Sequence, residues 1–173
     1  ASEVSDSSFV SGYSPRVSAL NSHSIQLLER CGVLEHIQRS APFKEMQTKD
    51  SEGTGEICFS TEDVTHADQL GMVVENQLVT QGLFRQLELA ENITTLFEHR
   101  LEELDRVDGR VEMVFDNGET LVCDLLVAAD GGHSKVRELR GSRAVGWQYD
   151  QTAIVTTVRC ERSHNSIPRQ WFT

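Results

Sequence analysis

The sequence of 173 residues lacks the features that mark several classes of protein. It contains no run of about eighteen apolar residues, which is the length that a membrane-spanning helix requires. Its first residues, Ala1–Asp6, lack the basic and then apolar pattern of a secretory signal. Basic residues are outnumbered, with 16 Lys and Arg against 27 Asp and Glu and a net charge of −11. This charge repels nucleic-acid phosphates and no basic stripe offsets it, so we do not expect nucleic acid as a partner.

Cysteine and histidine are too scattered to indicate a metal centre. The four cysteines, Cys31, Cys58, Cys123 and Cys160, include no C-x-x-C pair, and the six histidines do not pair at metal-ligand spacing. Each cysteine has apolar neighbours in the sequence, so we expect ordinary reduced thiols that are buried or half-buried. No catalytic triad or ligand cluster is present either, and we predict no metal site.

Apolar spacing and capping residues predict three helices, over residues 21–32, 76–90 and 134–140. Asn21 or Ser22 can cap the first helix, and Gly32 is a natural stop for it. Asn76 can cap the second helix. Within that helix Gly82 costs about 1 kcal/mol relative to Ala unless another group packs closely against it.

Alternating or continuous apolar runs predict strands at residues 46–50, 56–60, 72–75, 93–97, 111–115, 120–123, 125–129 and 154–158. The Asn117-Gly118 pair lies between two alternating runs and predicts a hairpin. Leu125–Ala129 is apolar at every position, as expected for a strand buried on both faces. The mixture of helices and strands indicates an α/β fold with α+β character. Residues 1–14 are rich in Ser, Gly and Asp and indicate a loop or frayed terminus.

The segment after the last of these apolar strands contains the clearest candidate site. Gly131 and Gly132 let the backbone pass close to another group, and Ser134 can cap the helix that follows. The start of that helix offers N–H groups to a phosphate, and Arg137 can pair with Asp130 or reach a pyrophosphate. A plain strand–turn–helix, with Asp130 as a cap and Arg137 on the surface, explains the same residues equally well.

Four motifs in order make the chain recognisable. The string Ala129-Asp130-Gly131-x-x-Ser134-x-x-Arg137 resembles the Asp-Gly motif of class A flavoprotein monooxygenases, which lies near the FAD pyrophosphate. Three further stretches are similar to segments of that family that contact FAD or lead into the substrate domain: 16–33, 74–78, and 147–155 with 169–172. Together the four motifs resemble most closely the ubiquinone-biosynthesis hydroxylases, which oxidise polyprenylated phenols.

The resemblance implies an FAD-dependent aromatic-ring hydroxylase that uses NAD(P)H and O₂ on a prenylated phenol. It implies that Arg16 and Gln77 contact FAD. It also implies that three residues lie at the pyrophosphate and nicotinamide side of the cofactor: Asp130, Gly131 and Arg137. Each of these residues also has a purely structural interpretation. Trp147 and Tyr149 are candidates for the substrate side or for packing at a domain junction. The resemblance further implies a cytoplasmic protein, peripheral at the inner membrane or attached to a ubiquinone-biosynthesis complex.

Two glycine motifs of the family are not found in the sequence. One is the opening G-x-G-x-x-G loop that holds the pyrophosphate, and the other is a later Gly-Asp motif that holds the ribityl chain. We therefore expect part of a longer enzyme. Residues 1–145 are expected to form an incomplete Rossmann-like FAD/NAD(P)-binding region, and 146–173 the start of a β-sheet substrate domain. Residues 40–75 are candidates for the substrate-side sheet.

The missing glycine loop predicts that this chain alone binds FAD weakly or not at all. It also predicts exposed apolar strands that self-association can cover. Two other functions remain compatible with the sequence. One is a flavin-dependent prenyl-lipid reductase on the same scaffold, and the other is an interaction module that kept the fold without the chemistry.

Overall fold

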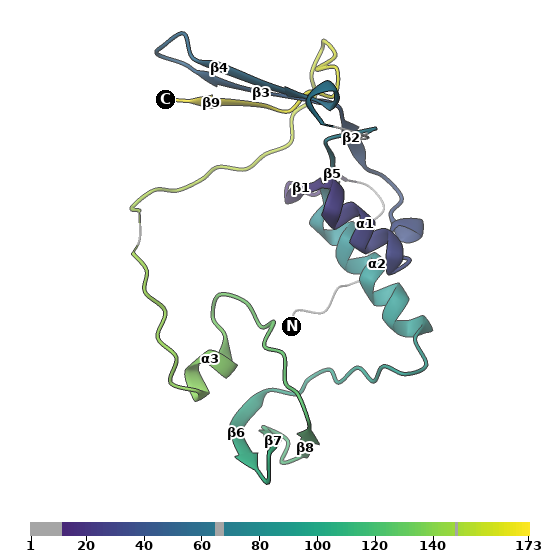
Figure 1. The fold of residues 1–173 in the computed structure, drawn as a ribbon, viewed down its shortest axis with the longest axis vertical. Coiled ribbons are helices and arrows are strands. Elements are labelled where there is room, and N and C mark those ends of the chain that lie inside the picture. The colour runs from purple at the N-terminus through teal and green to yellow at the C-terminus, as the bar shows by residue number, and fades with distance from the viewer. Residues whose placement is uncertain (1–11, 65–67, 148) are drawn as a thin grey trace. The chain divides into compact units, whose positions relative to one another are not determined.

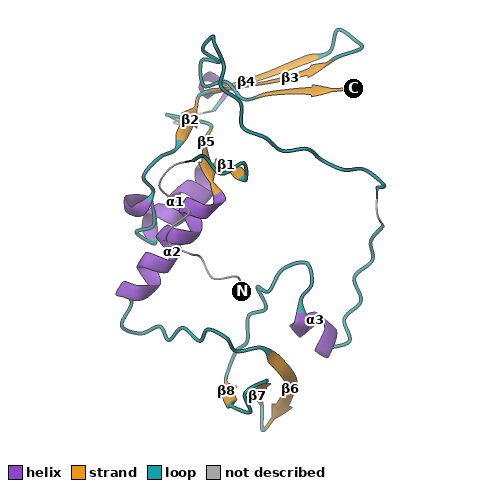
Figure 2. Ribbon diagram, turned by 180° about the vertical axis from the view of Figure 1, so that it is seen from behind, coloured by secondary structure: helices purple, strands orange, loops and turns teal. Residues whose placement is uncertain are grey.

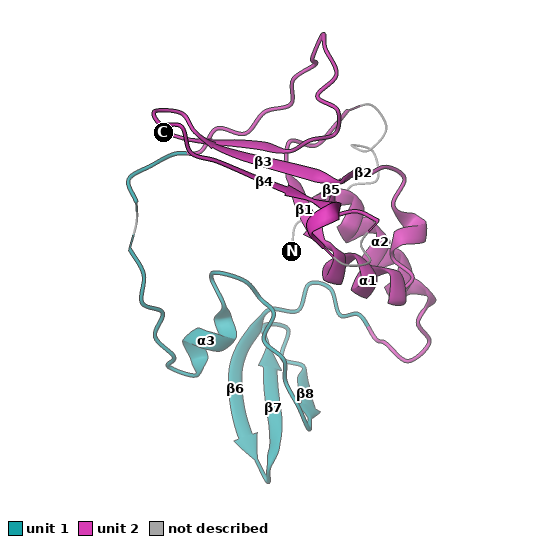
Figure 3. Cartoon of the chain, turned by 45° about the horizontal axis from the view of Figure 1, so that its top comes forward, with its two compact units in different colours: residues 1–4, 95–152 teal, residues 5–94, 153–173 magenta. Residues whose placement is uncertain are grey.

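The computed structural model describes residues 12–64, 68–147 and 149–173. The described residues form two units, which are coloured separately in Figure 3. Unit 1 contains residues 95–152, and unit 2 contains the described residues before 95 together with 153–173. Each unit is described by itself below.

Unit 2 contains two three-stranded sheets (Figure 1). The first has the order β1 (Val17–Asn21), β5 (Gly71–Glu75) and β2 (Ala41–Phe43), with both pairings antiparallel. The second has the order β4 (Glu56–Ser60), β3 (Glu45–Asp50) and β9 (Arg169–Phe172). In this sheet β4 runs antiparallel to β3, whereas β9 runs parallel to it. The central strand β5 is almost wholly buried, and it leads directly into a helix.

The helices of unit 2 are α1 (Ser22–Arg30) and α2 (Asn76–Leu89), with short 3₁₀ turns at Leu34–His36 and Thr61–Asp63 (Figure 2). Asn21 caps α1 as predicted, because its side-chain oxygen accepts a hydrogen bond from the Ser24 amide at 2.9 Å. Gly32 ends the same helix in the left-handed conformation, with φ of 71°. Asn76, in contrast, is the first residue of α2 and does not cap it. The cap position belongs to Glu75.

The core of unit 2 lies between β5, α2 and the end of α1. Val33 is fully buried, and Val74 and Leu78 are 2% and 6% exposed. Gly82 lies against Val33, since a Cβ atom at position 82 would come within 2.9 Å of the Val33 Cγ1 and 3.0 Å of its carbonyl oxygen. This contact accounts for a glycine in the middle of α2, where Ala would otherwise favour the helix.

Unit 1 contains one antiparallel sheet and one short helix. The sheet has the order β6 (Leu101–Val107), β7 (Arg110–Phe115) and β8 (Thr120–Cys123), and the helix is α3 (Lys135–Leu139). The predicted hairpin at Asn117-Gly118 is confirmed, since this turn joins β7 to β8. Asp108 and Gly109, which both have positive φ, form the two-residue turn between β6 and β7.

Three predicted strands are wrong. Residues 93–97, 125–129 and 154–158 form no strand in the structure (Figure 2). Leu125 and Val127 are 77% and 75% exposed, and no segment that the structure describes hydrogen-bonds alongside them as a strand. A continuous apolar run indicates a tendency to be buried. A strand also needs a neighbouring backbone to pair with, and sequence alone does not supply that neighbour.

The structure also contains strands that the apolar pattern missed. Of these, β6 is the clearest, because it carries acidic and basic residues and still pairs along β7. The mixed α and β content of the fold is confirmed. The pairing of β9 with β3 joins residues 45–50 and 169–172 in one sheet. The predicted domain boundary between residues 145 and 146 stays a prediction.

The expectation of buried or half-buried thiols is wrong for three of the four cysteines. Cys123 is half-buried, whereas Cys31, Cys58 and Cys160 are exposed. Cys58 illustrates the reason, because it lies in β4, an edge strand whose apolar sequence neighbours are themselves exposed. Within the described part of the chain, no helix combines the length and the apolar character that crossing a membrane requires.

Candidate functional site

The junction between β5 and α2 brings together the two residues predicted to contact FAD. Val17 of β1 pairs with Glu75 of β5, and the Asn76 amide donates to the carbonyl of Arg16 at 3.0 Å. Arg16 therefore lies beside the first turn of α2, which contains Gln77. Both side chains are exposed, and neither makes a hydrogen bond or ion pair with any residue that the structure describes.

Glu75 is the buried polar residue of this junction. It is 7% exposed, and its carboxylate accepts hydrogen bonds from the Arg39 Nε at 2.5 Å, the Arg39 Nη2 at 2.9 Å and the Ser14 amide at 2.6 Å. Arg39 also donates to the carbonyl of Gly12 at 3.0 Å and stacks 4.7 Å from the centre of the Tyr13 ring. This network, which we call the Glu75 clamp, joins residues 12–14 and Arg39 to the start of α2.

The charges of the clamp stabilise one another. The hydrogen bond from Arg39 is the main cause that lowers the pKa of Glu75 below its usual value, with burial opposing it and the Ser14 amide adding to it. The same hydrogen bond raises the pKa of Arg39. Glu75 is therefore ionised at neutral pH and its charge is compensated, as a buried carboxylate requires.

Neither Glu75 nor Arg39 was predicted from the sequence as a site residue. Glu75 follows a buried apolar strand and directly precedes a helix, which is where a carboxylate complements the helix dipole. That pattern could have marked Glu75. Arg39 lies 36 residues away in a segment without periodicity, and no local signal connects the two.

The other three predicted residues lie after β8: Asp130 and Gly131 in the turn before α3, and Arg137 in α3 itself. Asp130 Oδ2 accepts a hydrogen bond from the Val136 amide at 3.2 Å, and the Ser134 oxygen accepts one from the Arg137 amide at 3.0 Å. The Ser134 hydroxyl, followed by the Val136 amide, lowers the pKa of Asp130. Gly131 has a φ of 81°, which disfavours any residue with a side chain.

Arg137 does not pair with Asp130 in the structure. Its guanidinium donates instead to the carbonyl of Gly132, within the same turn. The backbone at Gly131 and Gly132 borders open space, since a Cβ atom at either position would meet nothing within 4 Å. The turn thus holds its carboxylate and guanidinium locally and leaves its glycine side uncovered by the described residues.

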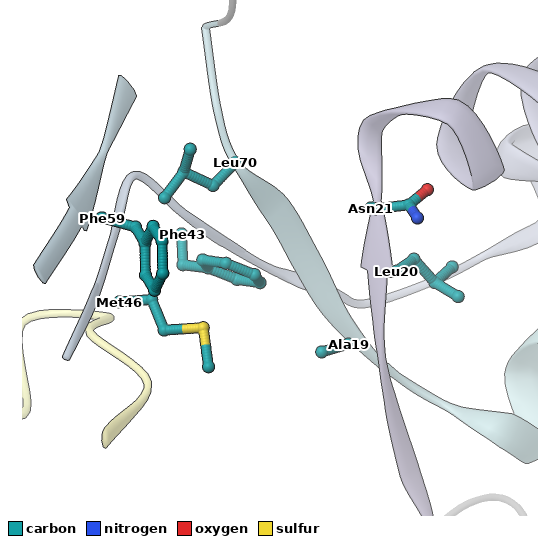
Figure 4. A pocket seen from close by; sticks show the side chains of 7 residues that line it. All are labelled: Ala19, Leu20, Asn21, Phe43, Met46, Phe59 and Leu70. Atoms are coloured by element: carbon teal, nitrogen blue, oxygen red, sulfur yellow. The ribbon is translucent and has the colours of Figure 1, made fainter. Parts of the chain in front are cut away.

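An open apolar pocket of about 330 Å³ lies in unit 2 (Figure 4). Its lining comes from β1, β2, β3, β4 and the residue before β5: Ala19, Leu20, Asn21, Phe43, Met46, Phe59 and Leu70. In Figure 4 the side chains of Phe43, Met46 and Phe59 gather on one side of a strand. The lining contains no charged residue, so this pocket does not offer the cationic groups that a pyrophosphate requires.

The predicted site residues therefore fall into two groups. Arg16 and Gln77 lie together in unit 2, and Asp130, Gly131 and Arg137 lie together in unit 1. Each group combines the start of a helix with an arginine. Their roles toward a cofactor stay predictions.

Comparison with known proteins identifies the family. A family model described as an FAD binding domain matches residues 8–167. The chain belongs to this FAD binding domain family. The match includes both junctions, so all five predicted contacts lie inside the FAD binding domain.

Curated relatives confirm the expected resemblance to ubiquinone-biosynthesis hydroxylases. The chain is 34% identical to the mitochondrial ubiquinone biosynthesis monooxygenase COQ6 of Rattus norvegicus, over 92% of this chain and 36% of the relative. It is 31% identical to the 3-demethoxyubiquinol 3-hydroxylase of Escherichia coli K12, over 91% of this chain and 40% of the relative. The chain thus spans well under half of the length of these relatives.

A solved structure supports the fold. The p-nitrophenol 4-monooxygenase PnpA of Pseudomonas putida DLL-E4 superposes with a TM-score of 0.60 at 23% identity, over 75% of this chain and 34% of that structure. At this identity the likeness concerns the fold alone, and it agrees with part of an FAD-binding domain.

Proposed function

We propose that this chain is the FAD-contacting part of a hydroxylase that acts on the aromatic ring of a prenylated phenol in ubiquinone biosynthesis. NAD(P)H is the proposed reductant and O₂ the proposed source of the hydroxyl group. The observation that carries the proposal is the family match across residues 8–167. The two relatives, a ubiquinone biosynthesis monooxygenase and a 3-demethoxyubiquinol 3-hydroxylase, support its substrate class.

The described residues fit such a cofactor. FAD supplies the redox and oxygen chemistry when bound, and the protein binds and orients it and excludes water. Arg16 and Gln77 would hold FAD at the β5–α2 junction, where the Arg16 guanidinium is exposed and without an acidic partner among the described residues. At the Asp130 turn, Arg137 would contribute charge and the uncovered backbone at Gly131 would allow close approach.

No side chain of this chain is proposed as a nucleophile or metal ligand, because the flavin carries the chemistry. The proposal includes a cytoplasmic protein that works at the inner membrane face, where prenylated substrates reside, with a ubiquinone-biosynthesis complex as a further partner. Self-association through exposed apolar segments, such as Leu125 and Val127, is proposed for the chain in isolation.

Flavin binding and oxygen consumption test this function. We expect the chain itself to be colourless and to quench flavin fluorescence weakly or not at all, and a yellow purified chain would contradict that expectation. The coding sequence should then be expressed with its flanking regions and supplied with NAD(P)H and a prenylated phenol. Phenol-dependent O₂ uptake with a hydroxylated product supports the proposal. Reduction of the prenyl lipid without O₂ uptake indicates the reductase, and a flavin-free protein indicates the interaction module.

A further inference from the structure

The three residues at 14, 16 and 18 are each tied to the start of α2. The Ser14 amide donates to Glu75, the Arg16 carbonyl accepts from the Asn76 amide, and the Ser18 hydroxyl donates to the Asn76 side chain at 2.6 Å. Arg16 is therefore fixed at its backbone on both sides, while its side chain remains exposed. The backbone of Arg16 is thus held in place, while its guanidinium pairs with no residue that the structure describes.

Arg39 completes the arrangement from a distant segment. It donates to both carboxylate oxygens of Glu75 and also to the carbonyl of Gly12. Arg39 therefore links the segment before Arg16 to the residue that precedes α2. Its side chain is 40% exposed and that of Glu75 only 8%, so the carboxylate is the group that depends on the pair for compensation.

The charge of the clamp matters for an anionic ligand. Glu75 stands opposite Val17 in the β1–β5 register, one position from Arg16. If its carboxylate were not compensated, it would attract the Arg16 guanidinium and repel a phosphate at the same place. With Arg39 bound to Glu75, the positive charge of Arg16 is left available.

We propose that Glu75 and Arg39 are positioning residues that hold Arg16 beside the first turn of α2 and keep its charge free for the anionic cofactor. The identity of that cofactor rests on the proposed function, whereas the positioning itself does not. Neither residue needs to touch the cofactor for this role.

Amide hydrogen exchange and carboxyl titration test the proposal on two variants, Arg39→Ala and Arg39→Lys. In Arg39→Ala, exchange at the Ser14 and Asn76 amides should become about tenfold faster, which corresponds to about 1.4 kcal/mol. The midpoint of the Glu75 carboxyl titration, followed by NMR, should move up toward its usual value. Arg39→Lys restores the charge without the planar fork, so it should recover the titration midpoint more fully than the exchange protection.

Arg85→Ala is the matched control, because it removes an arginine from an exposed pair with Glu88 on the same helix. It should leave both measurements as in the wild type. Unchanged exchange at Ser14 in Arg39→Ala overturns the proposal, and so does an equal acceleration along the whole β1–β5 ladder, which would mean a purely structural role. If Arg39→Ala does not fold, wild-type exchange at Ser14 in Arg39→Lys overturns it instead. A protein that shows the expected exchange but binds no flavin in any form would remove the proposed function and leave the positioning role intact.

Discussion

Two junctions in this chain place a carboxylate at the start of a helix, and only one of them buries it. Glu75 is 7% exposed and is held by residues 36 and 61 positions away in the sequence. Asp130 is exposed, and its hydrogen bond in the described structure reaches only six positions along the chain. The first carboxylate thus depends on the tertiary fold, and the second depends on its own turn.

This difference separates stability from ligand binding. A buried carboxylate that loses its partners keeps the full cost of desolvation, so removing the partners of Glu75 should weaken the fold. An exposed carboxylate returns to water at little cost, so changes at the Asp130 turn should spare the fold and affect what binds there. The same substitution should therefore lower stability when it is made at Glu75 and leave stability nearly unchanged when it is made at Asp130.

The largest effect is expected where α2 packs against Val33. Gly82→Leu forces a side chain into a space where even a Cβ atom would lie 2.9 Å from the Val33 Cγ1, and we expect the free energy of unfolding to fall by about 3 kcal/mol. Urea denaturation followed by circular dichroism measures the change. Gly146→Leu is the control, because a Cβ atom there meets nothing within 4 Å. Equal destabilisation by both variants would show that the contact with Val33 is not the cause.

The next largest effect on stability is expected at Glu75, and Asp130 is its comparison. Glu75→Ala removes the carboxylate of the Glu75 clamp and leaves Arg39 and the Ser14 amide without this acceptor. The free energy of unfolding should therefore fall by about 1–3 kcal/mol. Asp130→Ala should leave the thermal midpoint close to that of the wild type, because the Ser134 cap on α3 remains. Calorimetry on the two variants compares them directly. A larger loss from Asp130→Ala than from Glu75→Ala would reverse the distinction between the junctions.

The features that sequence predicted well are local. The Asn21 cap, the stop at Gly32 and the Asn117-Gly118 hairpin each depend on a few neighbouring residues, and all three are present in the structure. The pattern around Asp130 is local in the same sense, and its turn and helix formed as expected. The resemblance to flavin hydroxylases rested on such local motifs and is confirmed by the relatives.

The features that sequence missed depend on distant partners. Leu125–Ala129 has the composition of a buried strand but no described strand beside it, whereas the charged residues of β6 form a strand because β7 lies alongside. The Asp108-Gly109 turn was the available signal for β6. Arg39 could not be found in this way, because its partner Glu75 lies 36 residues away in the sequence.

The contacts of Glu75 in unit 2 and of His99 in unit 1 should respond to pH in opposite directions. The pKa of Glu75 is lowered, chiefly by Arg39, so its contribution to stability is complete above the usual value of 4.5 and is lost as pH falls through the lower folded value. In unit 1 the ring nitrogens of His99 face the Phe97 carbonyl at 2.6 Å and the Glu119 carboxylate at 2.8 Å. These contacts, the Phe97 carbonyl first, raise the pKa of His99.

The contribution of His99 is therefore complete below 6.5 and is lost as pH rises through its higher folded value. Hydrogen exchange between pH 3 and 9, corrected for the intrinsic rate, should show α2 loosening at the acid end and β7 at the basic end. Glu75→Gln should remove the first change and His99→Gln the second. A change of α2 at the acid end that persists in Glu75→Gln, or a change of β7 at the basic end that persists in His99→Gln, would contradict this assignment.

The smallest effect on stability is expected from the two arginines assigned to the cofactor. Arg16 has an exposed side chain, and the Arg137 guanidinium donates, among the described residues, only to the nearby Gly132 carbonyl. Arg16→Ala and Arg137→Ala should thus leave the unfolding midpoint close to that of the wild type.

In the longer protein of which we propose this chain is part, each should weaken FAD binding about tenfold, the effect of losing one charge-assisted hydrogen bond. Flavin fluorescence titration measures the affinity, with Arg85→Ala as the control on an exposed arginine outside both junctions. Unchanged affinity in Arg16→Ala would remove the β5–α2 junction from the proposed cofactor site, and the Glu75 clamp would then serve the fold alone.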